Sequence, residues 1–350
     1  MKKSSYIGID LGDRFHQVCG VDHSGGVVER ERIANTREVL ERFFSGRASA
    51  VVALEAGTHS AWIGRLLEEC GHRVVVANPR HVRAIWDRDR KSDVSDAEML
   101  ARLVRVDPTL LHPIRLRSET TQADQQTIKV REGLVRTRTR LINQVRGLAK
   151  SAGYSLVGST SRAFVPNARE GLSGAIVEAM EPLLAVIEAT ELQIRALDRK
   201  IQQIGAERYP VTARLRQVAG VGPLTSLAYV LAIEDPTRFR QSREVGPYLG
   251  LVPRRDQSGE TDKQLSITKT GNRYLRCLLV SSAQYIMGPF APPSALRAFG
   301  FRLAERGGKN AKRRAAVAVA RKLAVLLHAL WVSDAPYDPN HGVPSAPQAA

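Results

Sequence analysis

The chain has 350 residues, of which 43% are hydrophobic, so it is long enough for two or three domains with real cores. Its 52 Lys and Arg against 35 Asp and Glu leave a net charge of +17, which indicates a polyanionic partner, either nucleic acid or an anionic membrane. The three cysteines are far apart, which disfavours a zinc or disulfide framework. No apolar leader is found, which disfavours a signal peptide. No 18-residue apolar run is found, which disfavours a membrane-spanning helix.

Residues 5–104 are predicted to form an α/β unit. Strand-like segments at 5–12, 16–22 and 27–33 are joined by tight turns, which predicts an antiparallel meander. Helices are then predicted at 36–45, 59–70, near 79–88 and at 93–105, with strands at 50–56 and 73–78 between them. This order predicts a mixed sheet with helices on its faces.

Residues 115–207 carry almost no strand signal and are predicted to form two antiparallel helices. In the second helix, positions 183, 187, 190, 194, 197, 201 and 204 alternate in steps of four and three, and six of the seven are apolar, which is typical of a coiled-coil seam. The first helix lies in a segment, 115–150, with nine Lys or Arg and three Asp or Glu. This excess fits either a solvated helix face or a basic arm that contacts phosphates.

Residues 214–233 are predicted to form a helix, a Gly-Val-Gly-Pro turn and a second helix. The second helix begins just after Gly220 and Gly222, so its first N–H groups are available to a phosphate, as in a helix-hairpin-helix. Many helical hairpins carry such a turn without binding anything, which is the alternative reading.

The remaining ordered part is predicted to be mainly helical and strongly basic. Between residues 254 and 322, fifteen Lys or Arg stand against four Asp or Glu. The Pro- and Ala-rich tail at 334–350 is expected to be disordered.

Four carboxylates have placements that point to a divalent metal. Asp10 interrupts an apolar strand and Glu55 ends another, and both positions are costly for a carboxylate without a partner. Asp93 and Asp96 stand three apart at the start of a helix, on one face. If the first and fourth strands are neighbours, all four can converge, and oxygen ligands suit Mg²⁺ or Mn²⁺. The plainer alternative is that Asp96 caps its helix and Glu55 makes a local hydrogen bond.

The order of the strands, the acids and several motifs resembles the RNase H-like fold in its RuvC-like branch. The chain is most similar there to the DEDD transposases of insertion sequences, the bridge-RNA-guided recombinases, and to the related Piv-type DNA invertases. The motifs are IGIDLG, ALEAG, KSDVSDAEML, RQVAGVGPLTS, RFRQSREVGPYLGLVPRRDQSG and ITKTGNRYLR, and the resemblance covers about residues 5–330. It implies that Asp10, Glu55, Asp93 and Asp96 are the D, E, D and D of a metal-dependent site, with Mg²⁺ or Mn²⁺ as cofactor.

The same resemblance implies a serine nucleophile. Ser258 matches the family serine that attacks the DNA backbone and becomes covalently linked to phosphate, and Ser266 is a weaker candidate. From the residues alone, the Ser258–Gly259 pair is better explained as a turn. The cations expected to contact phosphate are Arg254, Arg255, Lys263, Lys269, Arg273 and Arg276.

Further expectations about partners and regions follow from the resemblance together with the residues, since the apolar seam at 183–204 favours oligomers and the three separated cysteines fit a reducing cytoplasm. The partners are donor and target DNA, a non-coding bridge RNA and other copies of the chain, as a dimer that becomes a tetramer on DNA. The expected place of action is the cytoplasm, at the nucleoid. The expected regions are a RuvC-like domain at 1–112, a coiled-coil arm at 113–207, a helical domain with Ser258 at 208–333 and a tail at 334–350.

Three other functions remain open from the residues themselves. A RuvC-like junction nuclease would use water and need the four acids without Ser258. A sugar-kinase or actin-like ATPase shares the word IGIDLG, but a second glycine-rich phosphate loop is not found. A non-catalytic nucleic-acid binder would leave Asp10 and Glu55 in their strands without a reason.

Overall fold

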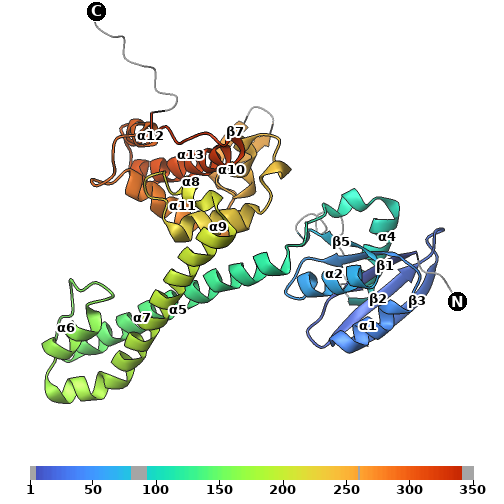
Figure 1. The fold of residues 1–350 in the computed structure, drawn as a ribbon, viewed down its shortest axis with the longest axis horizontal. Coiled ribbons are helices and arrows are strands. Elements are labelled where there is room, and N and C mark those ends of the chain that lie inside the picture. The colour runs from blue at the N-terminus through green and yellow to red at the C-terminus, as the bar shows by residue number, and fades with distance from the viewer. Residues whose placement is uncertain (1–4, 80–92, 259–260, 341–350) are drawn as a thin grey trace, which may run out of the picture. The chain divides into compact units, whose positions relative to one another are not determined.

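The computed structural model describes residues 5–79, 93–258 and 261–340, with the side chains of 256–264 left out. The chain divides into two compact units, Met1–Ser118 and Glu119–Ala350 (Figure 1). The helix predicted near 79–88 lies, after its first residue, outside the described residues.

The first unit is built on a five-stranded mixed sheet. Its elements are β1 (Tyr6–Asp10), β2 (Phe15–Val21), β3 (Val27–Ala34), α1 (Arg37–Ser45), β4 (Val51–Glu55), α2 (Ser60–Glu69), β5 (Arg73–Ala77), α4 (Asp93–Val106) and a short 3₁₀ helix at Pro108–Leu111. The sheet order is β3-β2-β1-β4-β5, with β1, β2 and β3 antiparallel and with β4 parallel to both β1 and β5. The mixed sheet predicted from the sequence is confirmed, including the pairing of the first and fourth strands.

Helices cover both faces of this sheet, and the period-two alternation of the strands decides which residues meet which helix. Ile7, Ile9, Val52 and Leu54 pack in one core with α1 and α2. On the opposite face, Ala53 packs with the apolar side of α4. The odd positions of β4 and the even positions of β1 therefore look towards α4.

A glycine allows α4 to lie directly on β1. A Cβ atom built on Gly8 would lie 2.0 Å from the carbonyl oxygen of Ala97 and 2.5 Å from the nitrogen of Ala101. The far end of the helix is held at the β2–β3 turn, where Arg102 donates to the carbonyl of Gly25 and Arg105 to that of His23. Because this turn lies at the amino-terminal end of β1, the amino terminus of α4 points to the carboxyl ends of β1 and β4.

The second unit is mostly helical. Its elements are α5 (Glu119–Ser151), α6 (Phe164–Gly171), α7 (Gly174–Arg208), α8 (Val211–Leu215), α9 (Pro223–Ile233), α10 (Val245–Tyr248), β6 (Pro253–Ser258), β7 (Thr261–Ile267), α11 (Arg273–Ile286), α12 (Ala295–Ala304) and α13 (Ala311–Ser333), with two 3₁₀ turns at Pro236–Arg238 and Ser242–Glu244.

The long helices α5 and α7 pack side by side and run in opposite directions (Figure 1). Arg131 pairs with Asp198 and Arg138 pairs with Glu191, so α5 advances along the chain as α7 returns. The predicted apolar seam of α7 faces inward, with 187, 190, 194, 201 and 204 buried and 183 and 197 half-buried. This seam is therefore covered within the chain.

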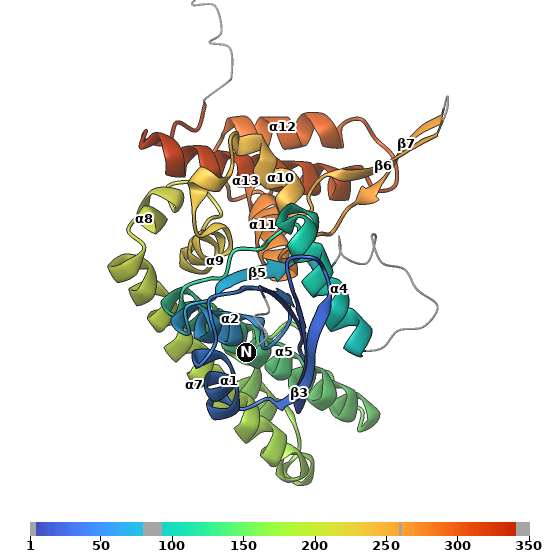
Figure 2. The ribbon, with the colours of Figure 1, turned by 90° about the vertical axis from the view of Figure 1, so that its right-hand side faces the viewer.

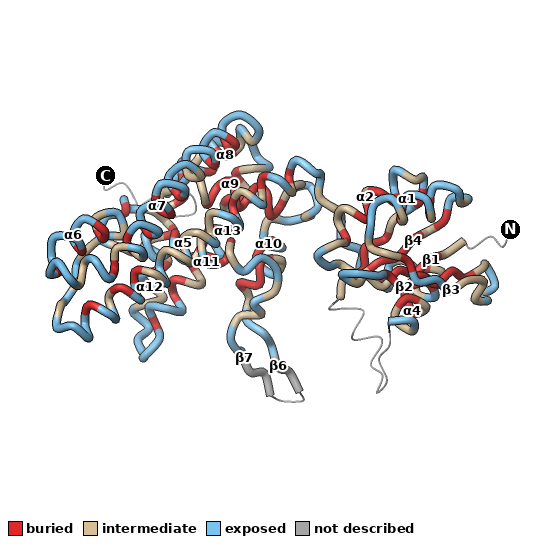
Figure 3. The backbone as a smooth tube through the Cα atoms, turned by 90° about the horizontal axis from the view of Figure 1, so that it is seen from below, coloured by how far each residue is buried: buried red, intermediate tan, exposed pale blue. Residues whose placement is uncertain are grey.

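The main core of the second unit lies among α9, α11 and α13 (Figure 3). Tyr229 of α9 is fully buried, its hydroxyl donates to the carbonyl of Ala324 at 2.7 Å, and burial raises its pKa well above the usual value. Helix α13 is long and apolar enough to cross a membrane by length and hydropathy, but half of its apolar window is buried in this core. Packing inside the unit thus explains the buried half of this window.

Two parts of the second unit differ from the prediction. The cationic segment around Ser258 lies in a region predicted to be mainly helical, yet it forms the hairpin β6–β7, which projects from the helices (Figures 2 and 3). The chain after α13 was expected to be disordered from residue 334, yet Tyr337 packs on the core and its N–H donates to Gln217. An aromatic ring supplies the buried apolar surface that a Pro- and Ala-rich composition does not suggest.

Candidate functional site

Asp10 and Glu55 lie at the same edge of the sheet. Asp10 is the last residue of β1 and Glu55 is the last residue of β4, and the two strands are parallel neighbours paired up to Ile9 and Leu54. Each acid is two residues beyond a residue that faces α4, namely Gly8 and Ala53, so each points to that same face. Both side chains are half-buried.

Asp93 and Asp96 belong to the first turn of α4. Asp93 is exposed and Asp96 is half-buried. Asp93 and Asp96 stand four residues before Ala97 and Leu100, which face the sheet. Because residues four apart share one side of a helix, the two acids lie on the side of α4 that faces the sheet. Since the amino terminus of α4 points to the carboxyl ends of β1 and β4, all four acids lie on one face at one end of the sheet.

The described side chains nevertheless form no group of three or more His, Cys, Asp or Glu close enough to hold a metal ion. Carboxylates repel one another, which keeps them apart unless a cation lies between them. The donor set itself fits a divalent cation, because four carboxylates supply the oxygen ligands that Mg²⁺ and Mn²⁺ prefer. The two acids that end strands are fixed by the sheet, and the two on α4 by the contact at Gly8.

A buried histidine network, which sequence reasoning missed, braces the loop after Asp10. The N–H of Gly12 donates to Nδ1 of His16 at 3.3 Å, and the side chain of Asn35 donates to the carbonyls of Gly12 and Asp13. His16 is completely buried; burial lowers its pKa, and nearby His59 acts in the same direction. The signal in the sequence was a histidine in an apolar strand, and Asn35 and His59 are too far along the chain for the network to be recognised.

Ser258 is the last residue of β6 and pairs with Thr261 across the hairpin. It therefore lies at the tip of a two-stranded ribbon, next to residues 259–260, which are outside the described part. Its side chain is not described, and because it belongs to the second unit, no geometry links it to the acids.

The predicted phosphate-contacting cations fall into two groups. Arg254 and Arg255 are exposed on β6, Lys269 is exposed at a left-handed backbone position, and Arg273 is exposed at the start of α11, while the side chain of Lys263 is outside the description. Arg276 differs: it is buried, and its guanidinium donates to the carbonyls of Leu249 and Thr270. Arg276 is thus committed to holding two loops together rather than to the surface where we expected it.

The glycine turn before α9 adopts the geometry of a helix start. Gly220 has a φ of +81° and leaves no room for a Cβ, which would lie 2.9 Å from the carbonyl oxygen of Ser282. Gly222 is the N-cap of α9, and Pro223 follows at its first position. The preceding helix, α8, ends at Leu215 and is shorter and earlier than predicted. An open cavity of about 450 Å³ beside this turn is lined by Gly220 and Gly222 among others.

Two family models and several curated relatives match the chain. A model of DEDD transposases matches residues 7–153, and one described as transposase of the IS116/IS110/IS902 family matches residues 212–297. A probable family 20 transposase of Pseudomonas aeruginosa is 31% identical over 96% of this chain and 99% of its own length. The transposase for insertion sequence element IS1111A of Coxiella burnetii is 26% identical, covering 96% of this chain and 92% of its own. A pilin gene-inverting protein of Moraxella bovis is 22% identical over 95% of this chain and 98% of its own.

Proposed function

Because the chain belongs to the IS116/IS110/IS902 family of transposases, we propose that it cuts and rejoins DNA with Ser258 as nucleophile and with Asp10, Glu55, Asp93 and Asp96 as metal ligands. Its mixed sheet and mostly helical second unit are consistent with an RNase H-like transposase. The observation that carries the proposal is the placement of four carboxylates, from three separate elements, on one face at one end of the sheet.

A bound divalent cation, Mg²⁺ in this proposal with Mn²⁺ as a substitute, would polarise a phosphodiester and stabilise charge on the oxygens around phosphorus. The protein holds the ligands for it on rigid elements. Asp10 and Glu55 are set by parallel strand pairing, and Asp93 and Asp96 by the close packing of α4 on Gly8. Fixed carboxylates of this kind need little reorganisation when charge develops.

Ser258 would attack phosphorus, so that one bond forms between its Oγ and phosphorus while one ester bond of the DNA backbone breaks. The serine proton passes to a base and the departing DNA oxygen takes up a proton, so charge and atoms balance. A hydroxyl at another DNA end then attacks the phosphoserine, which reforms a DNA ester and frees the serine. The number of phosphoester bonds stays constant, so rejoining needs no nucleotide cofactor.

The basic second unit supports a nucleic-acid partner. Net charge of +11 in residues 254–322, together with an aromatic content of only 5%, favours contacts to phosphates over extensive base stacking. The proposed partners are donor DNA, target DNA and a non-coding bridge RNA, and base pairing to that RNA would select the sequence. The resemblance to the family alone supports the bridge RNA as a partner. We propose that the protein acts at the nucleoid, in the cytoplasm.

The assembly on DNA is proposed as a dimer that becomes a tetramer. The seam of α7 does not argue for it, because this seam packs within the chain. We propose that the chain is divided into a RuvC-like domain at 1–112, a coiled-coil arm at 113–207 built on α5 and α7, and a helical domain at 208–333.

The proposal is tested by trapping the covalent intermediate. The purified protein is incubated with Mg²⁺, a candidate RNA from the flanking element and labelled target DNA, and the products are separated on denaturing gels. We expect a protein–DNA band that disappears in Asp10→Ala and Ser258→Ala. Ser266→Ala, an exposed serine on the partner strand of the same hairpin, is the matched control and should keep the band.

Two outcomes would replace the proposal. Cleavage that survives Ser258→Ala but not Asp10→Ala would mean a water-using RuvC-like nuclease. DNA binding with no metal-dependent cleavage under any condition would mean a non-catalytic binder.

A further inference from the structure

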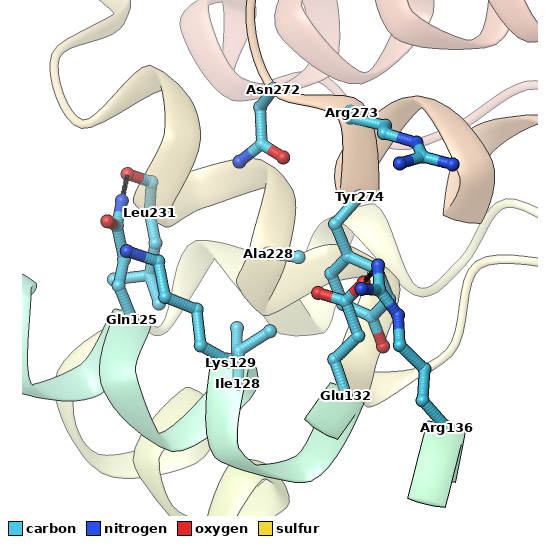
Figure 4. A pocket seen from close by; sticks show the side chains of 10 residues that line it. All are labelled: Gln125, Ile128, Lys129, Glu132, Arg136, Ala228, Leu231, Asn272, Arg273 and Tyr274. Atoms are coloured by element: carbon cyan, nitrogen blue, oxygen red, sulfur yellow. Dashed lines mark hydrogen bonds and ion pairs between the residues drawn. The ribbon is translucent and has the colours of Figure 1, made fainter. Parts of the chain in front are cut away.

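A pocket in the second unit, lined by residues of α5, α9 and the start of α11, has the features of a binding site. We call it the α5–α11 pocket. It holds about 240 Å³ and is lined by Gln125, Ile128, Lys129, Glu132 and Arg136 of α5, Ala228 and Leu231 of α9, and Asn272, Arg273 and Tyr274 at the start of α11 (Figure 4).

The floor of the α5–α11 pocket is apolar and one wall is aromatic. Ile128, Ala228 and Leu231 are buried and form the floor. Tyr274 is half-buried on one side, and its phenol interacts electrostatically with Arg131, which pairs with Asp198. Burial raises the pKa of this phenol, so Tyr274 is neutral at physiological pH.

The rim is polar and positively charged. Asn272 lies across the pocket from Ile128 and Lys129 (Figure 4). Its Oδ1 accepts from the N–H of Leu275 at 3.1 Å, which leaves its amide N–H₂ as a donor to a ligand. Of the three rim cations, Arg136 pairs with Glu132, whereas Lys129 and Arg273 form no ion pair within the described chain.

This combination fits a single nucleobase of a strand. A base has two apolar faces, which the floor and an aromatic ring can contact, and a polar edge, which an amide can bind. The volume is below the roughly 300–1,000 Å³ of pockets that take whole drug-sized ligands, so one flat ring system is the appropriate occupant. Lys129 and Arg273 lie on opposite sides of the pocket (Figure 4), which suits a strand that carries a phosphate before and after the base.

We propose that the α5–α11 pocket holds one unpaired base of a nucleic-acid strand, with Lys129 and Arg273 on its flanking phosphates. This rests on the proposed function only in requiring that the chain binds nucleic acid; it needs neither the serine nor the metal. The site would let the protein recognise a bulge or an extruded nucleotide, a structural feature that phosphate contacts alone do not distinguish.

The test compares three labelled duplexes by fluorescence anisotropy on the full-length protein: one with a single-nucleotide bulge, one without, and one in which the bulged nucleotide is abasic. We expect the bulged duplex to bind about tenfold more tightly than the other two, from stacking of one base. Ala228→Leu fills the floor without changing charge and should remove the preference. Lys129→Ala should weaken bulge binding more than Lys150→Ala, which removes an exposed lysine at the far end of α5.

A second measurement does not depend on any variant. A photoreactive base at the bulge should crosslink in the unmodified protein to the peptide that contains Tyr274. Equal affinity for the bulged and perfect duplexes, a preference that a folded Ala228→Leu protein keeps, or crosslinks elsewhere would each overturn the pocket proposal. Binding of free nucleoside monophosphate without any bulge preference would overturn it too, in favour of a free-nucleotide site. Loss of binding to all three duplexes would instead contradict the proposed function.

Discussion

Replacing Gly8 with alanine should damage both the stability of the first unit and its chemistry. The added Cβ would lie 2.0 Å from the carbonyl oxygen of Ala97, well inside van der Waals contact, and that atom is backbone, so no rotamer change can relieve the clash. Helix α4 must then retreat from β1 by about 1 Å or more. Overpacking of this kind costs about 1–3 kcal/mol of unfolding free energy.

The same retreat would carry Asp93 and Asp96 away from Asp10 and Glu55. A displacement of about 1 Å in a catalytic group can lower the rate about 100-fold. We therefore expect Gly8→Ala to lower the urea midpoint, to speed hydrogen exchange in residues 93–106, and to reduce the yield of the covalent protein–DNA complex about 100-fold.

Gly46→Ala is the matched control, because Gly46 has open space around it and an ordinary φ of −87°. Alanine there should leave stability unchanged or raise it by about 0.4–1 kcal/mol. If Gly8→Ala matched Gly46→Ala in urea midpoint and in exchange of α4, the reasoning that close packing positions the helix acids would be wrong.

Three other changes test separate parts of the chain. Burial opposes ionisation of Glu191, but hydrogen bonds from Arg138 and Arg195 outweigh it and lower its pKa, so its stabilisation is present above about pH 4.5 and is lost as the pH falls. Glu191→Gln should therefore cost about 1–3 kcal/mol at pH 7 in urea unfolding and weaken the acid dependence; an unchanged midpoint would contradict the role of this ion cluster. The pKa of His16 is lowered in the folded state, so the unfolded state binds more protons and the free energy of unfolding falls as the pH drops below 6.5. We therefore expect the urea midpoint of His16→Gln to depend less on pH than that of the wild type. An equal drop between pH 7.5 and 5.5 in both proteins would exclude His16 as the source of the pH dependence. Mg²⁺ at 100 times its dissociation constant should raise the free energy of unfolding of the wild-type protein by about 2.7 kcal/mol, as measured by calorimetry with and without the ion. An equal gain in Asp10→Asn would exclude the Asp10 carboxylate as a ligand.

The sequence predicted the first unit well because its signals are local. Strands such as YIGID and VVALE are short apolar runs bounded by turns, and each was placed within a residue or two. Pairing of the first and fourth strands places Asp10 and Glu55 at the same edge of the sheet. The face on which α4 lies could not be read in this way, since it depends on the contact between Gly8 and a helix about ninety residues later.

The second unit held more that the sequence could not reveal. The sequence of the β6–β7 segment is mostly polar, and the alternating apolar residues Leu265 and Ile267 at the end of β7 are too few to mark a half-buried strand. Arg276 looked like any other cation of a basic segment, yet it is buried against two backbone carbonyls. The α5–α11 pocket joins residues more than a hundred positions apart, and no local pattern brings Lys129 and Asn272 to the same pocket.

The chain order of the two units has a consequence for timing during synthesis. The unit with the acids ends at Ser118, and Ser258 follows 140 residues later. At about 5–20 residues per second, the ribosome needs roughly 7 to 28 s to make that interval, and amino-terminal domains generally fold first. A nascent chain would thus fold the unit that carries the four carboxylates well before Ser258 is synthesised. If Ser258 is the nucleophile, as proposed, a chain whose translation stops before residue 258 cannot exchange DNA strands, even when its first unit has folded.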